Sequence, residues 1–306
     1  MGFSTLAIVG PTASGKSNLA IRIALAFKSE GIEAEIINAD AMQLYRSLDI
    51  GTAKLSTVEM QGVEHHLLDV IDPTMEMTAA EYSRLAQDKI KALISSNKLP
   101  ILVGGSMFYV AAALDRLDFA PTDPVVRAEL EAREKVVGKL SLHAELQALD
   151  PVSAKNIHPQ NSRKVIRALE VISLTGEPFA SSFPDPQYLL PTLTLGIDVS
   201  RDVLKQRISQ RVDQMWSKGI VEETRGLIES GQTLSKTAAA AIGYSQAAQQ
   251  LKGELSESEA ISETVQLTNR YARRQMSWFR RDKRIFWLAD GPNLLSQALE
   301  RIRLEQ

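Results

Sequence analysis

The segment at residues 10–17 constrains the fold of this 306-residue chain more than any other. It lies between a short apolar run at residues 6–9 and a stretch of helical pattern reaching about residue 28. It matches G-x-x-x-x-G-K-[ST], which between a strand and a helix forms a phosphate-binding loop. Backbone N–H groups and the helix N-terminus favour an anion, the lysine adds a positive charge, and the last hydroxyl suits Mg²⁺. The expected diphosphate- or nucleotide-binding residues are Gly10, Pro11, Thr12, Ala13, Ser14, Gly15, Lys16 and Ser17, with Ser17 also a metal ligand.

Strand-like and helix-like segments alternate along much of the chain. Apolar runs predict strands at residues 6–9, 35–38, 101–103, 193–198 and 285–288. Thr78 and Glu81 have the spacing of a capping box that opens a helix, and Ser200 can cap another that ends near residue 218. Strands that alternate with helices favour a parallel sheet. We therefore expect an α/β protein with a P-loop NTPase-like parallel sheet core.

The pattern changes between residues 117 and 190, where prolines separate helical stretches. Asp123 followed by Pro124 predicts the start of a helix that runs to about residue 136. A second helix is predicted at residues 162–175, because Gly176 is a typical stop. We therefore predict a helical insertion domain at residues 117–190 inside a discontinuous catalytic core made of residues 1–116 and 191–306.

One long, basic helix is predicted after Ser256, which forms a capping box with Glu259. Its positive charges could follow nucleic-acid phosphates, or they could simply face solvent. For the aromatic residues Trp278 and Phe279 we favour a place in the core. The basic residues assigned to this helix are Arg270, Arg273, Arg274, Arg280, Arg281, Lys283 and Arg284.

Composition excludes several classes of site. The chain has no cysteine, which rules out disulfides, iron–sulfur clusters and thiolate zinc sites and agrees with a reducing cytoplasm. The apolar run at residues 6–9 is too short to span a bilayer, and Leu6 stands where a myristoylation signal needs Ser or Thr. We expect a cytoplasmic protein without a targeting segment. The net charge of -2 neither supports nor excludes nucleic-acid binding.

The phosphate loop alone identifies a polyphosphate and not a reaction. A GTPase is disfavoured. The run Asn97-Lys98-Leu99 resembles the start of a guanine-recognition motif, but that motif needs an aspartate at the next position, where this chain has Pro100. The run Ile36-Ile37-Asn38-Ala39-Asp40 approximates the acidic strand end of an ATPase. ATP binding, ATP hydrolysis and kinase chemistry therefore stay open on the loop alone.

Further segments resemble signatures of the tRNA dimethylallyltransferases, also called tRNA isopentenyltransferases. They are D-A-M-Q-L-Y-R at 40–46 with D-I-G-T-A-K at 49–54, G-G-S-M-F-Y at 104–109, and R-K-V-I-R-A-L-E at 163–170. I-G-Y at 242–244 and R-Q-M-S-W-F-R at 274–280 add to the resemblance, which covers residues 6–288 with the motifs in the same order.

The resemblance implies transfer of a dimethylallyl group from dimethylallyl diphosphate to N6 of the adenosine immediately 3′ of the anticodon, without consumption of ATP. By resemblance, Asp40 is the general base, Ser106 lines the reaction channel, and Lys16 with Mg²⁺ neutralises the diphosphate. Arg211 matches a diphosphate-binding arginine, although a lone helical arginine equally suits a surface ion pair. For Asp40 the alternative is a helix-capping or Mg²⁺-holding aspartate.

The target base must leave the anticodon loop to reach such a site, which is a form of base flipping. The resemblance therefore implies that the insertion domain binds the anticodon stem-loop. The tRNA-binding residues carried over by the motifs are Asp40, Ala41, Met42, Gln43, Ser106, Arg127, Arg163, Lys164, Val165, Ile166, Arg167, Ala240, Ala241, Ile242, Gly243, Tyr244 and Ser245.

Some residues depart from the family pattern. Ala41 replaces the usual Ser, Ser106 replaces Thr and keeps a hydroxyl, and Ala240 replaces a longer polar residue. The pair His65-His66 is better explained as structural, because adjacent side chains do not converge on one metal. No Cys₂His₂ tail follows the core, unlike eukaryotic members of the family, so the resemblance implies a bacterial-type enzyme. We expect it to be a monomer.

Three other functions remain as alternatives. An isopentenyltransferase acting on free AMP, ADP or ATP would not need the Arg163 and Arg167 pair or the insertion. A small-molecule or nucleotide kinase would transfer the γ-phosphate of ATP. A nucleotide-gated RNA-binding switch would form no covalent product.

Overall fold

The computed structural model describes residues 2–179 and 186–305, and these form two compact units. Unit 1 comprises Met1–Arg116 and Tyr188–Gln306, and unit 2 comprises Leu117–Gln187. The second break falls after Gln187 instead of residue 190. The reason is that Leu189 N–H donates to Leu114 O (2.8 Å) and Tyr188 bridges Asp115, which fastens this segment to unit 1.

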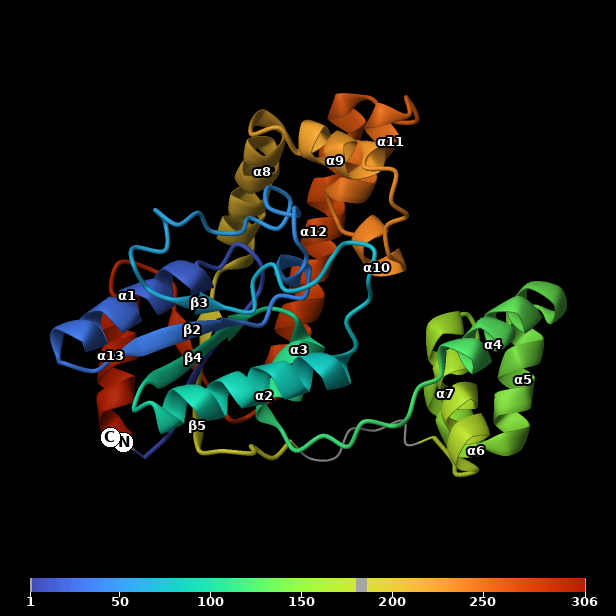
Figure 1. The fold of residues 1–306 in the computed structure, drawn as a ribbon, viewed down its shortest axis with the longest axis horizontal. Helices are drawn as coiled ribbons and strands as arrows, with labels where there is room; N and C mark the ends of the chain where they lie inside the picture. Colours follow the sequence, from blue (N-terminus) through green and yellow to red (C-terminus); the bar gives the residue numbers. More distant parts are fainter. Residues whose placement is uncertain (1, 180–185, 306) are drawn as a thin grey trace. The chain divides into compact units, whose positions relative to one another are not determined.

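Unit 1 is built on a six-stranded parallel sheet with the order β3-β2-β4-β1-β5-β6, which confirms the α/β class (Figure 1). The central strands β1 and β4 are buried along their whole length, as expected for a parallel sheet with helices on both faces. The strands are β1 Thr5–Val9, β2 Ala34–Asn38, β3 His65–His66, β4 Leu99–Gly104, β5 Thr192–Asp198 and β6 Ile285–Ala289.

Two helix pairs pack directly on or beside this sheet. α1 lies against β1, β2 and β4 and packs on α13, while α2 and α3 pack on each other and on β4. The predicted capping box of Thr78 and Glu81 opens α2, where each residue bonds the backbone N–H of the other. These elements are α1 Lys16–Ser29, the short 3₁₀ helix η1 Met42–Leu44, α2 Ala79–Ser95, α3 Met107–Leu114 and α13 Leu294–Leu304.

A second helical group of unit 1 supplies side chains to the site. α8 packs on α12 and α9, and α11 packs on α9 and α12. The predicted capping box of Ser256 and Glu259 opens α12. The group comprises α8 Arg201–Ser217, α9 Ile220–Glu229, α10 Lys236–Ala239, α11 Tyr244–Leu251 and α12 Glu257–Phe279.

Unit 2 is a small helical bundle with its own apolar core. Asp123 accepts from the backbone N–H groups of Val125 and Val126, and Gly176 ends the last helix in a left-handed conformation. The core contains Leu130, Leu142, Leu146 and Leu169. Its helices are α4 Pro124–Val137, α5 Lys139–Leu149, α6 Pro151–Asn156 and α7 Ser162–Thr175. In the described ranges of both units, no helix combines the length and apolar character needed to cross a bilayer.

Candidate active site

The phosphate loop connects β1 to α1, at the carboxyl edge of the sheet. Gly15 caps α1 with φ of 86°, a left-handed conformation that a side chain would strain. Lys16 folds back over the loop, and its Nζ donates to Pro11 O at 2.7 Å. The loop is therefore closed around its own lysine at the N-terminus of a 14-residue helix, where backbone dipoles favour an anion.

The charge state of Lys16 depends on its surroundings. Burial lowers the pKa of Lys16 to about 8, the negative charge of Asp40 partly offsets this, and the positive charge of Arg211 lowers the pKa further. An anion in the loop would favour the protonated ammonium and so raise this pKa. The lysine is therefore suited to hold a phosphate that binds and leaves.

Arg211 lies against the phosphate loop, and the alternative of a surface ion pair is wrong. Its Nη1 donates to Thr12 Oγ1 at 3.1 Å and its Nη2 donates to Thr52 O at 3.0 Å. Within the described residues, its buried Nε and the buried Ser14 Oγ find no hydrogen-bond partner. Buried polar atoms normally have partners. An oxyanion is the kind of group that would satisfy both of them.

Asp40 follows β2, whose neighbour β4 also pairs with β1. Its Oδ1 accepts from Met42 N–H at 3.0 Å, so this oxygen holds the turn that leads into η1. Asn38 fixes the backbone on the other side, because its Oδ1 accepts from Asp40 N–H at 2.9 Å. No donor in the described part of the chain bonds Oδ2. The helix-capping role is thus real for one oxygen, and it leaves the other available for chemistry.

The loop after β4 brings Ser106 to the same edge. Ser106 Oγ accepts from Ala41 N–H at 2.9 Å, which joins the two loops that follow β4 and β2. This close approach needs Gly104, where a Cβ would lie 2.2 Å from Ala39 O. The hydroxyl of Ser106 therefore bonds the backbone N–H of the residue next to Asp40. That residue is Ala41, where the family pattern has serine, and the bond does not depend on its side chain.

Two site residues from α12 were not predicted as such. Tyr271 lies beside Ser106 and Gln275; burial raises its pKa to about 12, with a further contribution from the charge of Asp40. Gln275 is buried and bonds both the phosphate loop and the loop after β4. Two signals in the sequence could have found them: the residues are four apart on the predicted helix and so share a face, and Gln275 falls inside the 274–280 segment that resembles the family.

The segment at residues 240–245 leads into α11. Its predicted tRNA contacts are unequal in exposure: Ala240 is exposed, Ile242 and Ser245 are half-buried, and Ala241, Gly243 and Tyr244 are buried. The Tyr244 hydroxyl accepts from Gly51 N–H at 3.1 Å and donates to Glu223. In the predicted segment after Asp40, Gln43 Nε2 donates to Thr52 O at 3.1 Å, and Met42 is half-buried. Tyr244 and Gln43 therefore both hold the 49–54 segment in place.

In unit 2, Glu170 organises two of the predicted RNA-binding arginines. Its side chain is fully buried, and its Oε2 accepts from Arg127 Nη2 at 2.7 Å and from Arg167 Nη1 at 2.8 Å. Burial opposes ionisation, but the hydrogen bonds from Arg127, Arg167 and Thr122 lower the pKa of Glu170 to about 2. Arg163 and Lys164 are exposed on the same helix.

Two of the residues predicted to contact RNA have buried side chains in α7. Val165 and Ile166 have only 1% and 6% of their surface exposed and lie in the apolar core of unit 2. The motif R-K-V-I-R spans more than a full helical turn, so its middle residues face inward. Their side chains form the core and are not available to RNA in this structure.

The basic run was also assigned too broadly to one helix. α12 ends at Phe279, so Arg280, Arg281, Lys283 and Arg284 lie beyond it. Arg280 pairs with Asp198, and Arg284 pairs with Asp115 and Asp282 and stacks on the Tyr188 ring. Arg270, Arg273 and Arg274 are exposed on the helix. Phe279 is buried as predicted and Trp278 is half-buried.

The two adjacent histidines have separate hydrogen-bond partners. His66 Nε2 bonds Glu35 Oε2 at 2.6 Å, and His65 Nδ1 bonds Val63 O at 2.8 Å. They form β3, a two-residue edge strand that the sequence pattern did not predict. Across residues 2–179 and 186–305, no cluster of three or more His, Cys, Asp or Glu side chains could hold a metal.

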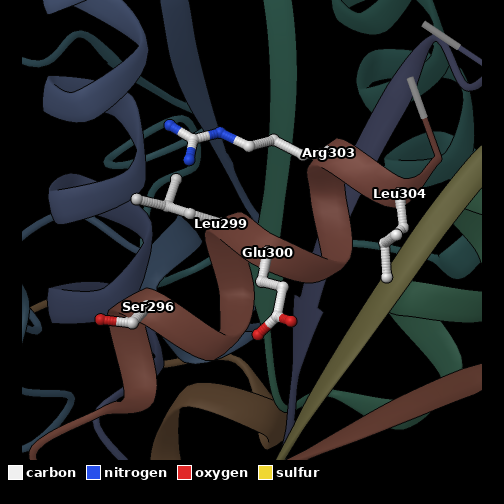
Figure 2. Close-up of a pocket in the computed structure, with 5 residues that line it drawn as sticks. All are labelled: Ser296, Leu299, Glu300, Arg303 and Leu304. Atoms are coloured by element: carbon white, nitrogen blue, oxygen red, sulfur yellow. The ribbon is translucent and has the colours of Figure 1, made fainter.

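A separate surface hollow lies along α13 and is lined by Ser296, Leu299, Glu300, Arg303 and Leu304 (Figure 2). It contains none of the phosphate-loop, Asp40 or Ser106 residues. The chemistry is therefore expected at the carboxyl edge of the sheet and not in this hollow.

Comparison with known proteins identifies the family. Residues 43–282 match the model of the IPP transferase family. The chain is 50% identical to a tRNA dimethylallyltransferase of Thermobifida fusca over 96% of this chain and 93% of that protein. It is 48% identical to the one of Salinispora arenicola over 98% of this chain and 86% of that protein.

Solved structures give the same result. A tRNA isopentenylpyrophosphate transferase from Bacillus halodurans has a TM-score of 0.71 and 36% identity, covering 99% of this chain and 96% of that one. A eukaryotic dimethylallyltransferase described as acting on tRNA has a TM-score of 0.80 and 25% identity, covering 98% and 78%. The chain therefore belongs to the IPP transferase family, together with the tRNA dimethylallyltransferases.

Proposed function

We propose that this protein transfers a dimethylallyl group from dimethylallyl diphosphate to N6 of the adenosine immediately 3′ of the anticodon in tRNA, releasing diphosphate. The observation that carries the proposal is an anion-binding loop after β1 and a carboxylate after β2, at the same edge of the sheet and separated by the single strand β4. The charge of Asp40 is close enough to Lys16 to raise the lysine pKa against the effect of burial. A base and a leaving-group site are thus held side by side.

The chemistry follows from these residues. N6 of adenosine is a weak nucleophile, because its lone pair is delocalised into the purine ring. As N6 forms a bond to the allylic carbon, the carbon–oxygen bond to the diphosphate breaks, and Asp40 Oδ2 accepts the N6 proton. Lys16, Arg211 and the loop amides stabilise the charge that develops on the departing diphosphate. Ser106 fixes the backbone beside the base through Ala41 N–H.

The donor set also fits Mg²⁺. This ion is usually held by one or two protein oxygens together with substrate phosphates. Ser17 is the protein ligand that the loop would provide, and we propose that Mg²⁺ supplies charge neutralisation when it is bound with the diphosphate.

For tRNA, we propose that exposed residues of α7 and the half-buried residues beside Asp40 make the contacts. Arg163 and Lys164 would bind phosphates of the anticodon stem-loop, with Arg127 and Arg167 held beside them by Glu170. Met42 would contact the flipped adenine region. We further propose that the protein is a cytoplasmic monomer.

The reaction is tested by incubating the protein with dimethylallyl diphosphate, Mg²⁺ and unmodified tRNA, and digesting the tRNA for nucleoside mass spectrometry. We expect N6-dimethylallyladenosine, and none when the adenosine 3′ of the anticodon is replaced by guanosine. Transfer to free AMP, ADP or ATP with unmodified tRNA left unchanged would contradict the proposal.

A further inference from the structure

Gln275 lies between the two loops that carry the proposed chemistry. It comes from α12 and has only 1% of its surface exposed. Its Oε1 accepts from Thr12 N–H of the phosphate loop at 2.8 Å. Its Nε2 donates to Gly105 O, in the loop after β4, at 2.8 Å. One buried amide therefore bonds both loops, with its acceptor on one and its donor on the other.

The backbone around this amide is shaped to admit it. A Cβ at Gly105 would lie 2.3 Å from Gln275 Nε2 and 3.1 Å from Gly10 O. A side chain at Gly105 would therefore displace either the amide or the phosphate loop. The close approach of Gln275 from α12 therefore explains why the second position of the 104–109 motif is glycine.

The position of Thr12 is fixed from two directions. Gln275 bonds its backbone N–H, and Arg211 Nη1 bonds its hydroxyl at 3.1 Å. The backbone N–H and the hydroxyl of Thr12 are thus both bonded by side chains from outside the loop.

We propose that Gln275 is a positioning residue that sets the spacing between the diphosphate cradle and the base side of the site. Its partner Gly105 immediately precedes Ser106, which in turn bonds Ala41 N–H next to Asp40 at 2.9 Å. The chain Thr12–Gln275–Gly105–Ser106–Ala41 therefore connects the leaving-group site to the base through single side chains and adjacent backbone. The inference rests on the proposed function and adds to it the residue that aligns donor and acceptor.

The decisive variant is Gln275→Met, which keeps the length of the side chain and removes both hydrogen bonds. Misalignment of reacting groups by a fraction of an ångström to one ångström has large effects on rate. We expect kcat for tRNA prenylation to fall about tenfold or more, while the Kd for tRNA stays within about twofold because the RNA-facing residues are untouched. Gln275→Glu keeps the acceptor for Thr12 N–H but places a carboxylate oxygen against Gly105 O, so we expect a loss of kcat there as well.

The matched control is Gln297→Met. Gln297 on α13 also bonds two backbone groups, accepting from Ala289 N–H at 3.2 Å and donating to Ala289 O at 3.3 Å, but it lies outside the site. We expect its kcat to match that of the unmodified protein after correction for the folded fraction by circular dichroism.

Binding of inorganic diphosphate with Mg²⁺, measured by calorimetry, tests the cradle separately from the transfer reaction. We expect Gln275→Met to weaken diphosphate at least about threefold, because the Thr12 backbone is released. If neither this affinity nor kcat changes in folded Gln275→Met, the inference is wrong. If the unmodified protein forms no prenylated nucleoside, the proposed function fails, and the diphosphate affinities of the two variants still decide the role of Gln275. If Gln275→Met does not fold, Gln275→Glu is measured in the same way, and wild-type kcat and diphosphate affinity there would contradict the inference.

Discussion

At the scale of single residues, Asp40 carries the proposed proton transfer. One carboxylate oxygen is occupied by Met42 N–H, and the other is free among the described residues. Asp40→Asn keeps the bond to Met42 N–H and removes the base. We expect kcat to fall by about 10²–10⁴-fold, with tRNA affinity within about twofold. The rate is measured by single-turnover transfer of labelled dimethylallyl, and a variant with a near wild-type rate would show that Asp40 is not the base.

The pKa of Lys16 predicts how donor binding depends on pH. The folded, free protein loses this proton as pH rises through about 8, whereas bound diphosphate favours the protonated form. Affinity for dimethylallyl diphosphate should therefore be nearly constant below that value and fall by up to about tenfold per pH unit above it. Calorimetry between neutral and alkaline pH measures this.

The control is Lys16→Arg, whose guanidinium stays protonated throughout. Its weaker affinity should show no comparable fall with pH. An identical fall in both proteins would assign the effect to another group.

Prediction from sequence succeeded for residues in a compact motif and failed for residues defined by the tertiary structure. The phosphate loop was recognisable because its geometry is encoded in consecutive residues. Arg211 could not be separated from a surface ion pair, because its bonds to Thr12 and Thr52 join segments distant in the chain. Gln275 carried no local signal of its role, since its partners lie more than 160 residues away.

At the scale of elements, helix ends were predicted where a cap was visible. α7 occupies the expected range Ser162–Thr175 and stops at Gly176. α12 stops at Phe279 with no glycine or proline to mark its end, so the basic run was extended too far. The edge strand β3 has only two residues and cannot show alternation.

The contribution of Glu170, on α7, to the stability of unit 2 can be tested by substitution. Glu170→Gln leaves Arg127 and Arg167 facing a neutral amide, and we expect unit 2 to be destabilised by about 3 kcal/mol. Amide hydrogen exchange of α4 and α7 in the full chain measures this. Because the folded pKa of about 2 lies below the ordinary value of 4.5, the stabilisation is present above pH 4.5 and is lost as pH falls toward 2.

The control for Glu170 is Glu145→Gln in the same unit. Glu145 pairs with Arg133 at the surface, so its loss should cost less than about 1 kcal/mol. Equal effects of the two substitutions would contradict the organising role of the buried carboxylate.

At the scale of the whole molecule, the insertion leaves and re-enters the core at adjacent points. Asp115 and Tyr188 form a bridge, and Leu189 N–H bonds Leu114 O at 2.8 Å. A short Gly-Ser linker replacing residues 117–187 should therefore leave unit 1 folded. We expect the shortened protein to bind diphosphate as the full chain does and to lose most of its tRNA affinity, measured by filter binding. Unchanged tRNA affinity would show that unit 2 is not the RNA-binding unit.

The α/β class and the parallel sheet followed from the alternation of elements, whereas the strand order is known only from the structure. The use of the phosphate loop could not be decided by the loop itself. The loop suits ATP as well as an isoprenoid diphosphate, and only the residues gathered around it from α8, α12 and the loop after β4 favour the second.

The most direct test is the stoichiometry of a single reaction. The reaction contains labelled dimethylallyl diphosphate, Mg²⁺ and unmodified tRNA, and no nucleoside triphosphate. The amount of label in tRNA and the amount of released diphosphate are measured in the same sample. We predict one diphosphate released for each dimethylallyl group transferred, and no effect of added ATP other than competition for the loop. A requirement for ATP hydrolysis, or ATP turnover without labelled tRNA, would contradict this prediction.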